Sequence, residues 1–398
     1  MVKCIFGPEE LTSDTKPEHI LHNALGGRKT SRCLICSAHN NTFGSTIDKE
    51  IATQVEVIRN MLQLDSGSGN APPMLKGIKS GADTINFRND GIPELAGKPF
   101  TIIPRADGTA EVQIMARSEE HLAQLVPHIA AQLKCSEDYV RETLAAGTAS
   151  IISKRPDGVH HPLSFGGMNA VRSIAKSCLE LWATVVGNDE VRSAPYAEAR
   201  EFVLTGTEAF NKNRTHLDSR FLPYSEQLKQ QFGPLFNLIY VISDDAGRVV
   251  GHFTLYNMIG WQIVLAQDGG LPNLRVGLIS NSLDPVVWSD SIAEKIDIPF
   301  DWVNNPDYSD ELKRSRDRFI SVAQAYHEGA SRRELERIVD DVFNEHGFAD
   351  DTAITDQQMQ DRIITEISRR AASMVVNVPY EKALSPAEIK ALLNKSKN

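Results

Sequence analysis

The stretch PEHILHNALGGRK at residues 17–29, together with CLICSAHNNTFG at residues 33–44, is the most informative part of the chain. It places an acidic residue beside a histidine, then a Gly-Gly pair with basic neighbours, and then a Cys-x-x-His-Asn run. Residues of these types can hold one divalent metal ion beside a general base. The stretch therefore predicts a centre that hydrolyses phosphodiesters.

A small finger-like fold is expected for this stretch. Ile20-Leu21 suits a short strand, Gly26-Gly27 suits the hairpin turn that follows, and residues 36–43 suit one or two helical turns. The expected local structure is a ββα finger. A unit of this size usually relies on a metal ion or on a neighbouring domain for rigidity.

Hydrolysis of a phosphodiester requires an activated water and a positive charge beside the phosphate. His19 can accept the proton of that water, because an unperturbed histidine has a pKa of about 6.5. A Mg²⁺-class ion prefers oxygen ligands and keeps several waters, so two side-chain oxygens and the substrate suffice to hold it. Glu18 and Asn40 are the candidate ligands.

Three blocks of this stretch resemble the HNH endonuclease superfamily: Glu18-His19-Ile20, Leu25-Gly26-Gly27 and Asn40-Asn41-Thr42-Phe43-Gly44. The resemblance covers residues 3–48 and implies a ββα-metal finger. It implies that His19 is the general base and that Glu18 and Asn40 bind one Mg²⁺ or Mn²⁺ ion. It further implies that DNA is the substrate and that the product carries a 5'-phosphate.

Members of this family often hold a structural zinc ion on two Cys-x-x-Cys pairs, and this chain departs from that pattern. The first pair reads Cys4-Ile5-Phe6-Gly7, and the second reads Cys36-Ser37-Ala38-His39. The remaining zinc ligands are Cys4, Cys36 and His39. Cys33 or His22 can supply a fourth ligand for tetrahedral zinc. Alternatively, the zinc is absent and packing holds the finger.

Other interpretations of the motif residues stay open. His19 can be a structural histidine, and Glu18 can form an ordinary surface pair with Lys29. Asn40 and Asn41 can both cap a helix, although the spacing to the Phe-Gly pair favours Asn40 as the ligand. Asp48 lies near the ion or in the first turn of the next helix, and the helix role is favoured.

Three basic residues of the motif are candidate contacts to DNA phosphates: Arg28, Lys29 and Arg32. They can equally be solvated loop charges. The whole chain carries a formal net charge of -10, so its surface as a whole does not attract nucleic acid, and any binding must use a local patch.

The rest of the chain alternates between helical and strand patterns. Apolar residues recur at helical spacing from Ile47 to Leu62, and residues 65–73 have the composition of a connection. Residues 100–103 and 110–114 predict a β-hairpin, and helices are expected over 118–133 and after the capping residue Ser136.

Later segments give stronger signals. A helix is expected over 170–186 with Gly187 as its stop, and residues 236–266 predict an antiparallel meander. A helix is also expected to begin at the capping box Ser331–Glu334, and another around 359–367. The fold class is therefore α+β, with an N-terminal ββα-metal finger, a larger mixed region containing the meander, and a helical C-terminus. The expected domains are 1–63, 74–155 and 156–398.

Composition places the chain among ordinary globular proteins, with 41% hydrophobic and 24% charged residues. No apolar run approaches the roughly 20 residues that cross a bilayer, and no secretory segment opens the chain, so a cytoplasmic location is expected. The cysteines number five, and metal ligation or free thiols suit them better than disulfides do.

These observations predict an HNH-type endonuclease whose C-terminal region regulates or targets it. Such fusions resemble restriction and phage-defence effectors, which suggests a homo-oligomer or protein partners from a defence system. The alternative is a non-catalytic nucleic-acid-binding or scaffold protein with a degenerate finger. A C-terminal enzyme or ligand sensor that controls the finger is a third possibility.

Overall fold

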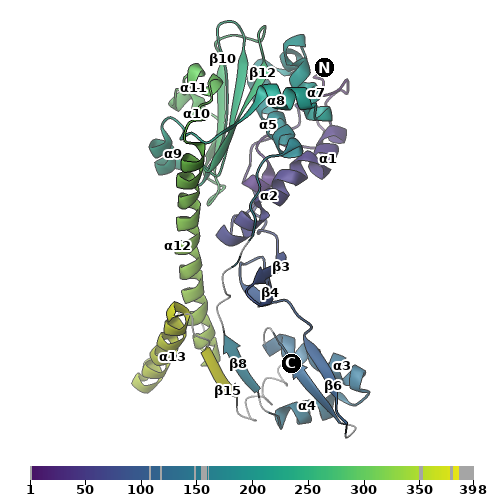
Figure 1. Cartoon of the computed structure of the whole chain (residues 1–398), viewed down its shortest axis with the longest axis vertical. Helices are drawn as coiled ribbons and strands as arrows, with labels where there is room; N and C mark the ends of the chain where they lie inside the picture. The colour runs from purple at the N-terminus through teal and green to yellow at the C-terminus, as the bar shows by residue number, and fades with distance from the viewer. Residues whose placement is uncertain are drawn as a thin grey trace. The chain divides into compact units, whose positions relative to one another are not determined.

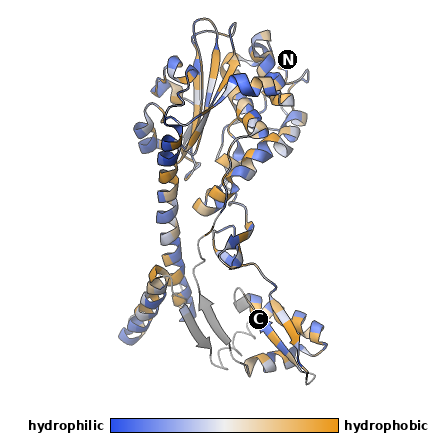
Figure 2. Cartoon of the chain, viewed as in Figure 1, coloured by the Kyte–Doolittle hydropathy of each residue, from blue (hydrophilic) through white to orange (hydrophobic). Residues whose placement is uncertain are grey.

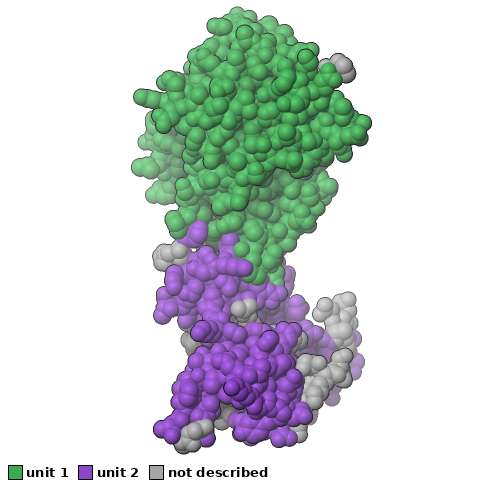
Figure 3. Space-filling view, turned by 90° about the vertical axis from the view of Figure 1, so that its right-hand side faces the viewer, with its two compact units in different colours: residues 1–74, 89–91, 162–330 green, residues 75–88, 92–161, 331–398 purple. Residues whose placement is uncertain are grey.

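The computed structural model describes residues 2–106, 109–116, 119–147, 149–153, 159, 161–348, 353–376 and 380–384. The chain divides into two compact units, shown in different colours in Figure 3. Unit 1 comprises residues 1–74, 89–91 and 162–330, and unit 2 comprises residues 75–88, 92–161 and 331–398. Unit 1 contains the whole N-terminal motif.

Unit 1 is built on one large sheet with helices on both sides. Its elements are β1 (Glu18–His19), the 3-10 helix η1 (Asn23–Leu25), β2 (Thr30–Ser31), α1 (Ser37–Ser45), α2 (Ile47–Leu62), α5 (Met168–Val186), α6 (Asn188–Val191), the 3-10 helix η2 (Ala194–Tyr196), α7 (Ala197–Thr205), α8 (Glu208–Arg214), β9 (Thr215–Asp218), α9 (Ser225–Phe232), β10 (Phe236–Ser243), β11 (Val249–Leu255), β12 (Ile259–Ala266), β13 (Arg275–Asn281), β14 (Trp288–Ser289), α10 (Ile292–Lys295), α11 (Phe300–Asn304) and the first part of α12 (Glu311–Glu345).

The sheet has six strands in the order β14-β13-β10-β11-β12-β9, and each neighbouring pair is antiparallel. The predicted meander is confirmed as its centre, since β10 pairs with β11 and β11 pairs with β12. Strands β13 and β9 extend this centre on either side, and the sequence analysis did not assign either of them.

Both faces of the sheet are buried. Its strands are largely apolar, as their colouring in Figure 2 shows. Along β10 the side chains alternate between two cores: Ile239 and Val241 pack on the side of α5, and Leu238 and Tyr240 pack on the side of α9, α10 and α11. Because successive side chains point to opposite faces and both faces are covered, nearly every residue of such a strand is apolar.

Helix α5 packs between the sheet and helix α2 (Figure 1). Its apolar positions recur at helical spacing, and Gly187 ends it with a φ of 86°, a conformation that glycine adopts without strain. The predicted helix and its stop are therefore confirmed. Trp182, near its C-terminal end, is fully buried and donates a hydrogen bond of 2.9 Å to the hydroxyl of Tyr196.

The first 63 residues do not form the separate unit that the sequence predicts. Side chains from Cys4 to Leu64 belong to the same hydrophobic core as α5, α7 and one face of the sheet. The unit continues to residue 74 and resumes at residue 162. A segment of this length has too little apolar surface for a core of its own, so it shares the core of a larger unit.

Unit 2 contains smaller sheets. Its elements are β3 (Leu75–Ser80), β4 (Asp83–Phe87), β5 (Pro93–Leu95), β6 (Phe100–Pro104), β7 (Ala110–Ile114), α3 (Glu119–Leu133), α4 (Glu137–Ala145), β8 (Ala149–Ser153), the second part of α12, α13 (Gln357–Val376) and β15 (Tyr380–Leu384). The predicted β6–β7 hairpin is confirmed, and so is the Ser136 cap of α4, whose hydroxyl accepts a hydrogen bond from the Tyr139 backbone.

One C-terminal prediction is wrong. The capping box at Ser331 does not begin a helix, because α12 already starts at Glu311 and runs unbroken to Glu345. A capping box satisfies free backbone N–H groups only where a helix begins, and residues 311–330 continue the helix in the N-terminal direction. The α+β class is confirmed. None of the helices in the described ranges is long and apolar enough to cross a membrane.

Candidate functional site

The motif folds in the expected order of strand, strand and helix. β1 pairs antiparallel with β2, and α1 follows. The first strand lies two residues earlier than predicted, and Ile20 and Leu21 are core residues beyond its end. Gly27 is required by a close approach: a Cβ atom there would lie 1.8 Å from the carbonyl oxygen of Leu21.

Glu18 lies on β1 with only 8% of its side chain exposed, and it contacts a residue that is distant in sequence. The ammonium of Lys176 on α5 donates a hydrogen bond of 2.5 Å to Glu18 Oε1 and one of 2.8 Å to Asp48 Oδ2. The same ammonium lies 5.8 Å from the ring centroid of Phe43, a residue of the motif. Helix α5 therefore inserts a positive charge directly into the motif.

Asp48 occupies the first turn of α2, as favoured from the sequence. It is also a member of this buried cluster, because its second oxygen accepts a hydrogen bond of 2.5 Å from the hydroxyl of Ser173. Glu180, one turn after Lys176 on α5, is fully buried, and its Oε1 lies 3.8 Å from the Lys176 ammonium. Three carboxylates thus surround one lysine.

Burial and the lysine act against each other on these carboxyl groups. Burial raises the pKa of Glu18 and of Glu180, and the charge of Lys176 opposes this effect. For Asp48 burial acts in the same direction, but the Lys176 charge and hydrogen bonds outweigh it and lower the pKa. The three acids in turn hold the pKa of Lys176 above its ordinary value in spite of burial. Lys176 is therefore an ammonium ion.

His19 is half-buried on β1, next to Glu18. Burial lowers its pKa from the ordinary value of 6.5, and the nearby Lys176 charge lowers it further. A neutral imidazole at neutral pH is able to accept a proton. His22 has a different role, because its Nδ1 accepts a hydrogen bond of 3.0 Å from the Ala24 backbone at the start of η1.

Asn40 makes a contact of another kind. Its buried side-chain amide donates a hydrogen bond of 3.1 Å to the carbonyl oxygen of Pro17, so it ties α1 to the residue before Glu18. The contacts of Glu18 and Asn40 are therefore separate. The side chains that share the Lys176 ammonium with Glu18 in this structure are Asp48 and, at a longer distance, Glu180.

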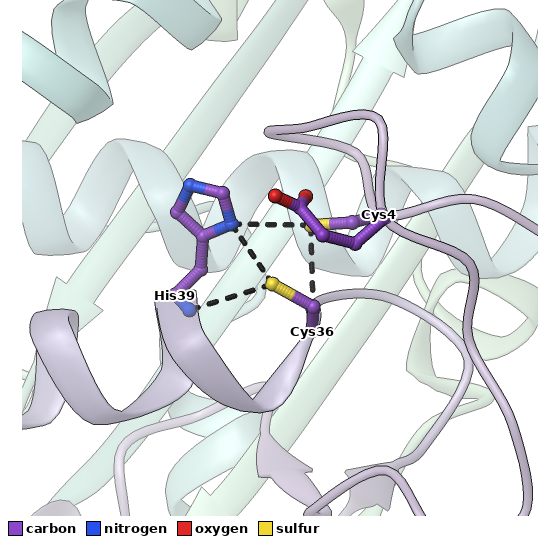
Figure 4. Close-up of side chains that lie close together, drawn as sticks. Cys4, Cys36 and His39 are labelled. Carbon is purple, nitrogen blue, oxygen red and sulfur yellow. Dashed lines mark hydrogen bonds between the residues drawn. The ribbon is translucent and has the colours of Figure 1, made fainter.

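A second cluster lies at the start of α1. Cys4, Cys36 and His39 point toward one another in Figure 4, with 3.1 Å between Cys36 Sγ and His39 Nδ1 and 3.5 Å between Cys4 Sγ and His39 Nδ1. Together with Glu9 they offer four ligand atoms that all lie within 4.8 Å of one another. Two thiolates, an imidazole and a carboxylate are ligands that tetrahedral zinc accepts.

The fourth member of this cluster is neither of the residues that the sequence analysis suggested. Cys33 is exposed, and His22 caps η1. Glu9 reaches the cluster because Gly7 leaves it room: a Cβ atom at Gly7 would lie 2.1 Å from Glu9 Oε2 and 2.9 Å from the His39 ring. Burial raises the pKa of the Cys4 thiol to about 11 when no metal is bound.

Two side chains that follow α5 fix the loops that carry this cluster. The side-chain amide of Asn188 donates hydrogen bonds of 2.7 Å to the Lys3 carbonyl and 2.8 Å to the Cys33 carbonyl. The guanidinium of Arg192 donates to the carbonyls of Cys4 and Gly7. Asn188 on α6 and Arg192 just after it therefore hold these loops in place.

The three basic residues proposed to contact phosphates differ in their surroundings. Arg28 is exposed in the segment before β2. Lys29 forms an ion pair of 2.5 Å with Asp290, and Arg32 donates a hydrogen bond to the Thr15 carbonyl. Of the three, Arg28 is the side chain most available to a phosphate.

The sequence analysis did not name the α5 members of the Lys176 cluster or Glu9 of the cysteine cluster. Ser173, Lys176 and Glu180 form a polar stripe at helical spacing within α5, whose other faces are largely apolar. A polar stripe on an otherwise buried helix was a readable signal of a buried polar partner. Glu9 carried no such signal, because no family spacing points to it.

Comparison with protein-family models, with curated proteins and with solved structures found no match to this chain. The resemblance to the HNH superfamily therefore rests on the motif at residues 3–48 alone.

Proposed function

We propose that the chain is a metal-dependent endonuclease of HNH type that hydrolyses DNA phosphodiester bonds. The observation that carries the proposal is the placement of His19, whose pKa lies below its ordinary value, beside the Glu18 carboxylate on a strand followed by β2 and α1. In this proposal an imidazole nitrogen of His19 takes a proton from the water that attacks the phosphate.

Glu18 and Asn40 remain the proposed ligands of a catalytic Mg²⁺ or Mn²⁺ ion, and Asp48 joins them because it converges on the same position as Glu18. Such an ion would stabilise the charge on the phosphate and on the departing 3'-oxygen. Arg28 would contact a neighbouring phosphate. A structural zinc ion on Cys4, Glu9, Cys36 and His39 would fix the start of α1.

The remaining regions would regulate the site or select its target, in keeping with a cytoplasmic restriction or phage-defence effector. The motif alone is too small for sequence readout, because single specific DNA-binding modules bury roughly 600–1,000 Å². We therefore also propose a self-assembled oligomer or protein partners of a defence system.

The test is incubation of supercoiled plasmid with the full chain and Mg²⁺, Mn²⁺ or EDTA. The wild type should nick the plasmid only when a divalent ion is present. His19→Ala should lower the rate by about 10²- to 10⁴-fold, the usual contribution of a general base. His327→Ala, which changes an exposed histidine of unit 1, should cleave as the wild type does. Full activity of the His19 variant would reject the assignment.

One observation favours a second candidate, a non-catalytic nucleic-acid-binding or scaffold protein. The Glu18 carboxylate is already neutralised by Lys176 and is nearly inaccessible. A protein of this class would bind DNA with salt-dependent affinity and leave the plasmid intact with every metal ion tested.

A further inference from the structure

The cluster around Lys176 combines charges that are rarely buried together. The exposed side-chain fractions are 2% for Lys176, 8% for Glu18, 6% for Asp48 and 0% for Glu180. Three acidic groups therefore meet one ammonium ion in a nearly dry environment. Buried charges are stable only when they are paired and hydrogen-bonded.

The pairing is incomplete at Glu180. Both of its carboxylate oxygens are buried without a hydrogen-bond partner among the described residues, and its contact with Lys176 is an ion pair of 3.8 Å. The ammonium gives its short contacts to Glu18 and Asp48 instead. The cluster therefore presents more carboxyl oxygens than one ammonium ion can hydrogen-bond.

An excess of carboxylate oxygen around one position is also the chemistry that attracts a hard divalent cation. Lys176 supplies a single charge on a flexible four-carbon chain that reaches in from α5. A divalent ion at this position would bring two charges and would accept more oxygen ligands. The ammonium and such an ion cannot occupy the position together, because like charges in a dry site repel strongly.

We propose that Glu18, Asp48 and Glu180 form a cation site whose resident occupant is the Lys176 ammonium, and that a divalent ion binds there only after this ammonium leaves. Lys176 then acts as a lock: its ammonium blocks the binding of a divalent ion at the motif. Because α5 packs against the sheet, any event that shifts α5 would alter access to the motif. The effect on cleavage rests on the proposed function, whereas the binding site does not.

The test compares Mn²⁺ binding by the full chain in wild type, Lys176→Met and Lys176→Arg. Methionine keeps much of the side-chain length and removes the charge, whereas arginine keeps the charge. Lys229→Met is the matched control, because Lys229 lies outside the motif and pairs with Glu226, whose side chain is 83% exposed. All samples are loaded with zinc and freed of excess metal, so that the cysteine cluster does not bind Mn²⁺. Binding is followed by titration calorimetry and by the melting temperature.

Lys176→Met should bind Mn²⁺ at least about tenfold more tightly than the wild type, because a site that is open less than about a tenth of the time loses that factor in apparent affinity. Its melting temperature should rise at Mn²⁺ concentrations about tenfold below those that raise the melting temperatures of wild type, Lys176→Arg and Lys229→Met. Adding Asp48→Asn to Lys176→Met should abolish the gain. Equal Mn²⁺ affinity in wild type and Lys176→Met would overturn the proposal.

A second pair of variants covers a failure of Lys176→Met to fold. The double variant Lys176→Met with Glu180→Gln removes the buried Glu180 carboxyl group as well, and Glu180→Gln alone is its reference. Tighter Mn²⁺ binding by the double variant than by Glu180→Gln supports the lock. Equal binding overturns it. Plasmid nicking by the same samples separates the two ideas. Mn²⁺ binding without nicking would support the cation site and reject the nuclease. If the wild type nicks the plasmid, and Lys176→Met changes neither the nicking rate nor the Mn²⁺ affinity, the lock is rejected and the nuclease is retained.

Discussion

Glu9 is exposed, yet its carboxylate lies within 4.8 Å of the possible metal-ligating atoms of two cysteines and a histidine. Its neighbour Glu10 is also exposed and lies outside this set, which makes the two residues a matched pair. Zinc sites are sensitive even to the residues behind their ligands, whose loss typically costs 10- to 100-fold in metal affinity.

We predict that Glu9→Ala lowers zinc affinity by at least about 10-fold, because it removes a ligand rather than a supporting residue. Glu10→Ala should keep the affinity of the wild type. Competition with a chromophoric chelator measures both. Equal affinities in the two variants would remove Glu9 from the ligand set.

His252 on β11 is a buried histidine outside the motif, with 1% exposure and a contact of 3.0 Å between its Nε2 and the Thr254 hydroxyl. Burial lowers its pKa from 6.5 to about 4. The unfolded chain therefore binds a proton on this residue between pH 6.5 and pH 4, whereas the folded chain does not. Stability from this residue is complete above pH 6.5 and is lost as the pH falls through that window.

We predict that His252 lowers the free energy of unfolding by up to about 1.4 kcal/mol for each unit by which the pH falls between 6.5 and 4. Burial also lowers the pKa of His22 to about 4, so His22 adds a change of the same sign. His252→Gln should reduce the slope, and His327→Gln should leave it unchanged. Urea unfolding at pH 7, 6 and 5 gives the slopes, and identical slopes in all three proteins would contradict the prediction.

At the scale of elements, α5 and β11 approach each other closely at Gly251. A Cβ atom added at Gly251 would lie 2.8 Å from Cys178 Sγ and 3.0 Å from Cys178 Cβ. Both residues belong to closely packed structure, and Cys178 is fully buried. Contacts shorter than van der Waals distance force neighbouring atoms to move, so this glycine sets the distance between helix and sheet.

We predict that Gly251→Ala destabilises the protein by about 1–3 kcal/mol, the usual cost of overpacking a core. Cys178→Ala removes the nearer of the two atoms, so the double variant should be less destabilised than the sum of the single variants. Chemical unfolding of the four proteins completes the double-mutant cycle. Additive effects would show that α5 and β11 are not in contact at this point.

At the scale of the whole molecule, the motif and the sheet share one core. The motif contributes Ile20, Leu21 and Phe43 to the cluster that contains α5. The hydrogen bonds from Lys176 and Asn188 also cross from residues 162–330 to the motif. Removing those residues would expose the apolar side chains and leave buried polar groups without partners.

We predict that a fragment of residues 1–74 is unfolded by itself, with or without zinc, because its apolar residues lack a core to fill. The nitrogen–proton NMR spectrum of the labelled fragment should show narrow dispersion. A folded, cooperatively melting fragment would contradict the shared core. Addition of a second fragment covering residues 162–330 should restore dispersion if the two pieces associate.

The sequence by itself determined the elements that depend on neighbouring residues. The strand–strand–helix order of the motif, the helix up to Gly187, the meander and the β6–β7 hairpin all follow from local periodicity and turn residues. The three cysteine and histidine members of the metal cluster could also be chosen, because family spacing points to them.

Only the tertiary structure decided which charges meet. Lys176 contacts Glu18 across 158 residues of sequence and Asp48 across 128, and no local pattern encodes such distances. The same holds for Glu9 in the metal cluster and for the core that joins residues 4–64 to α5 and the sheet. Local conformation depends on a few adjacent residues, whereas the pairing of buried charges depends on how the packed elements bring distant side chains together.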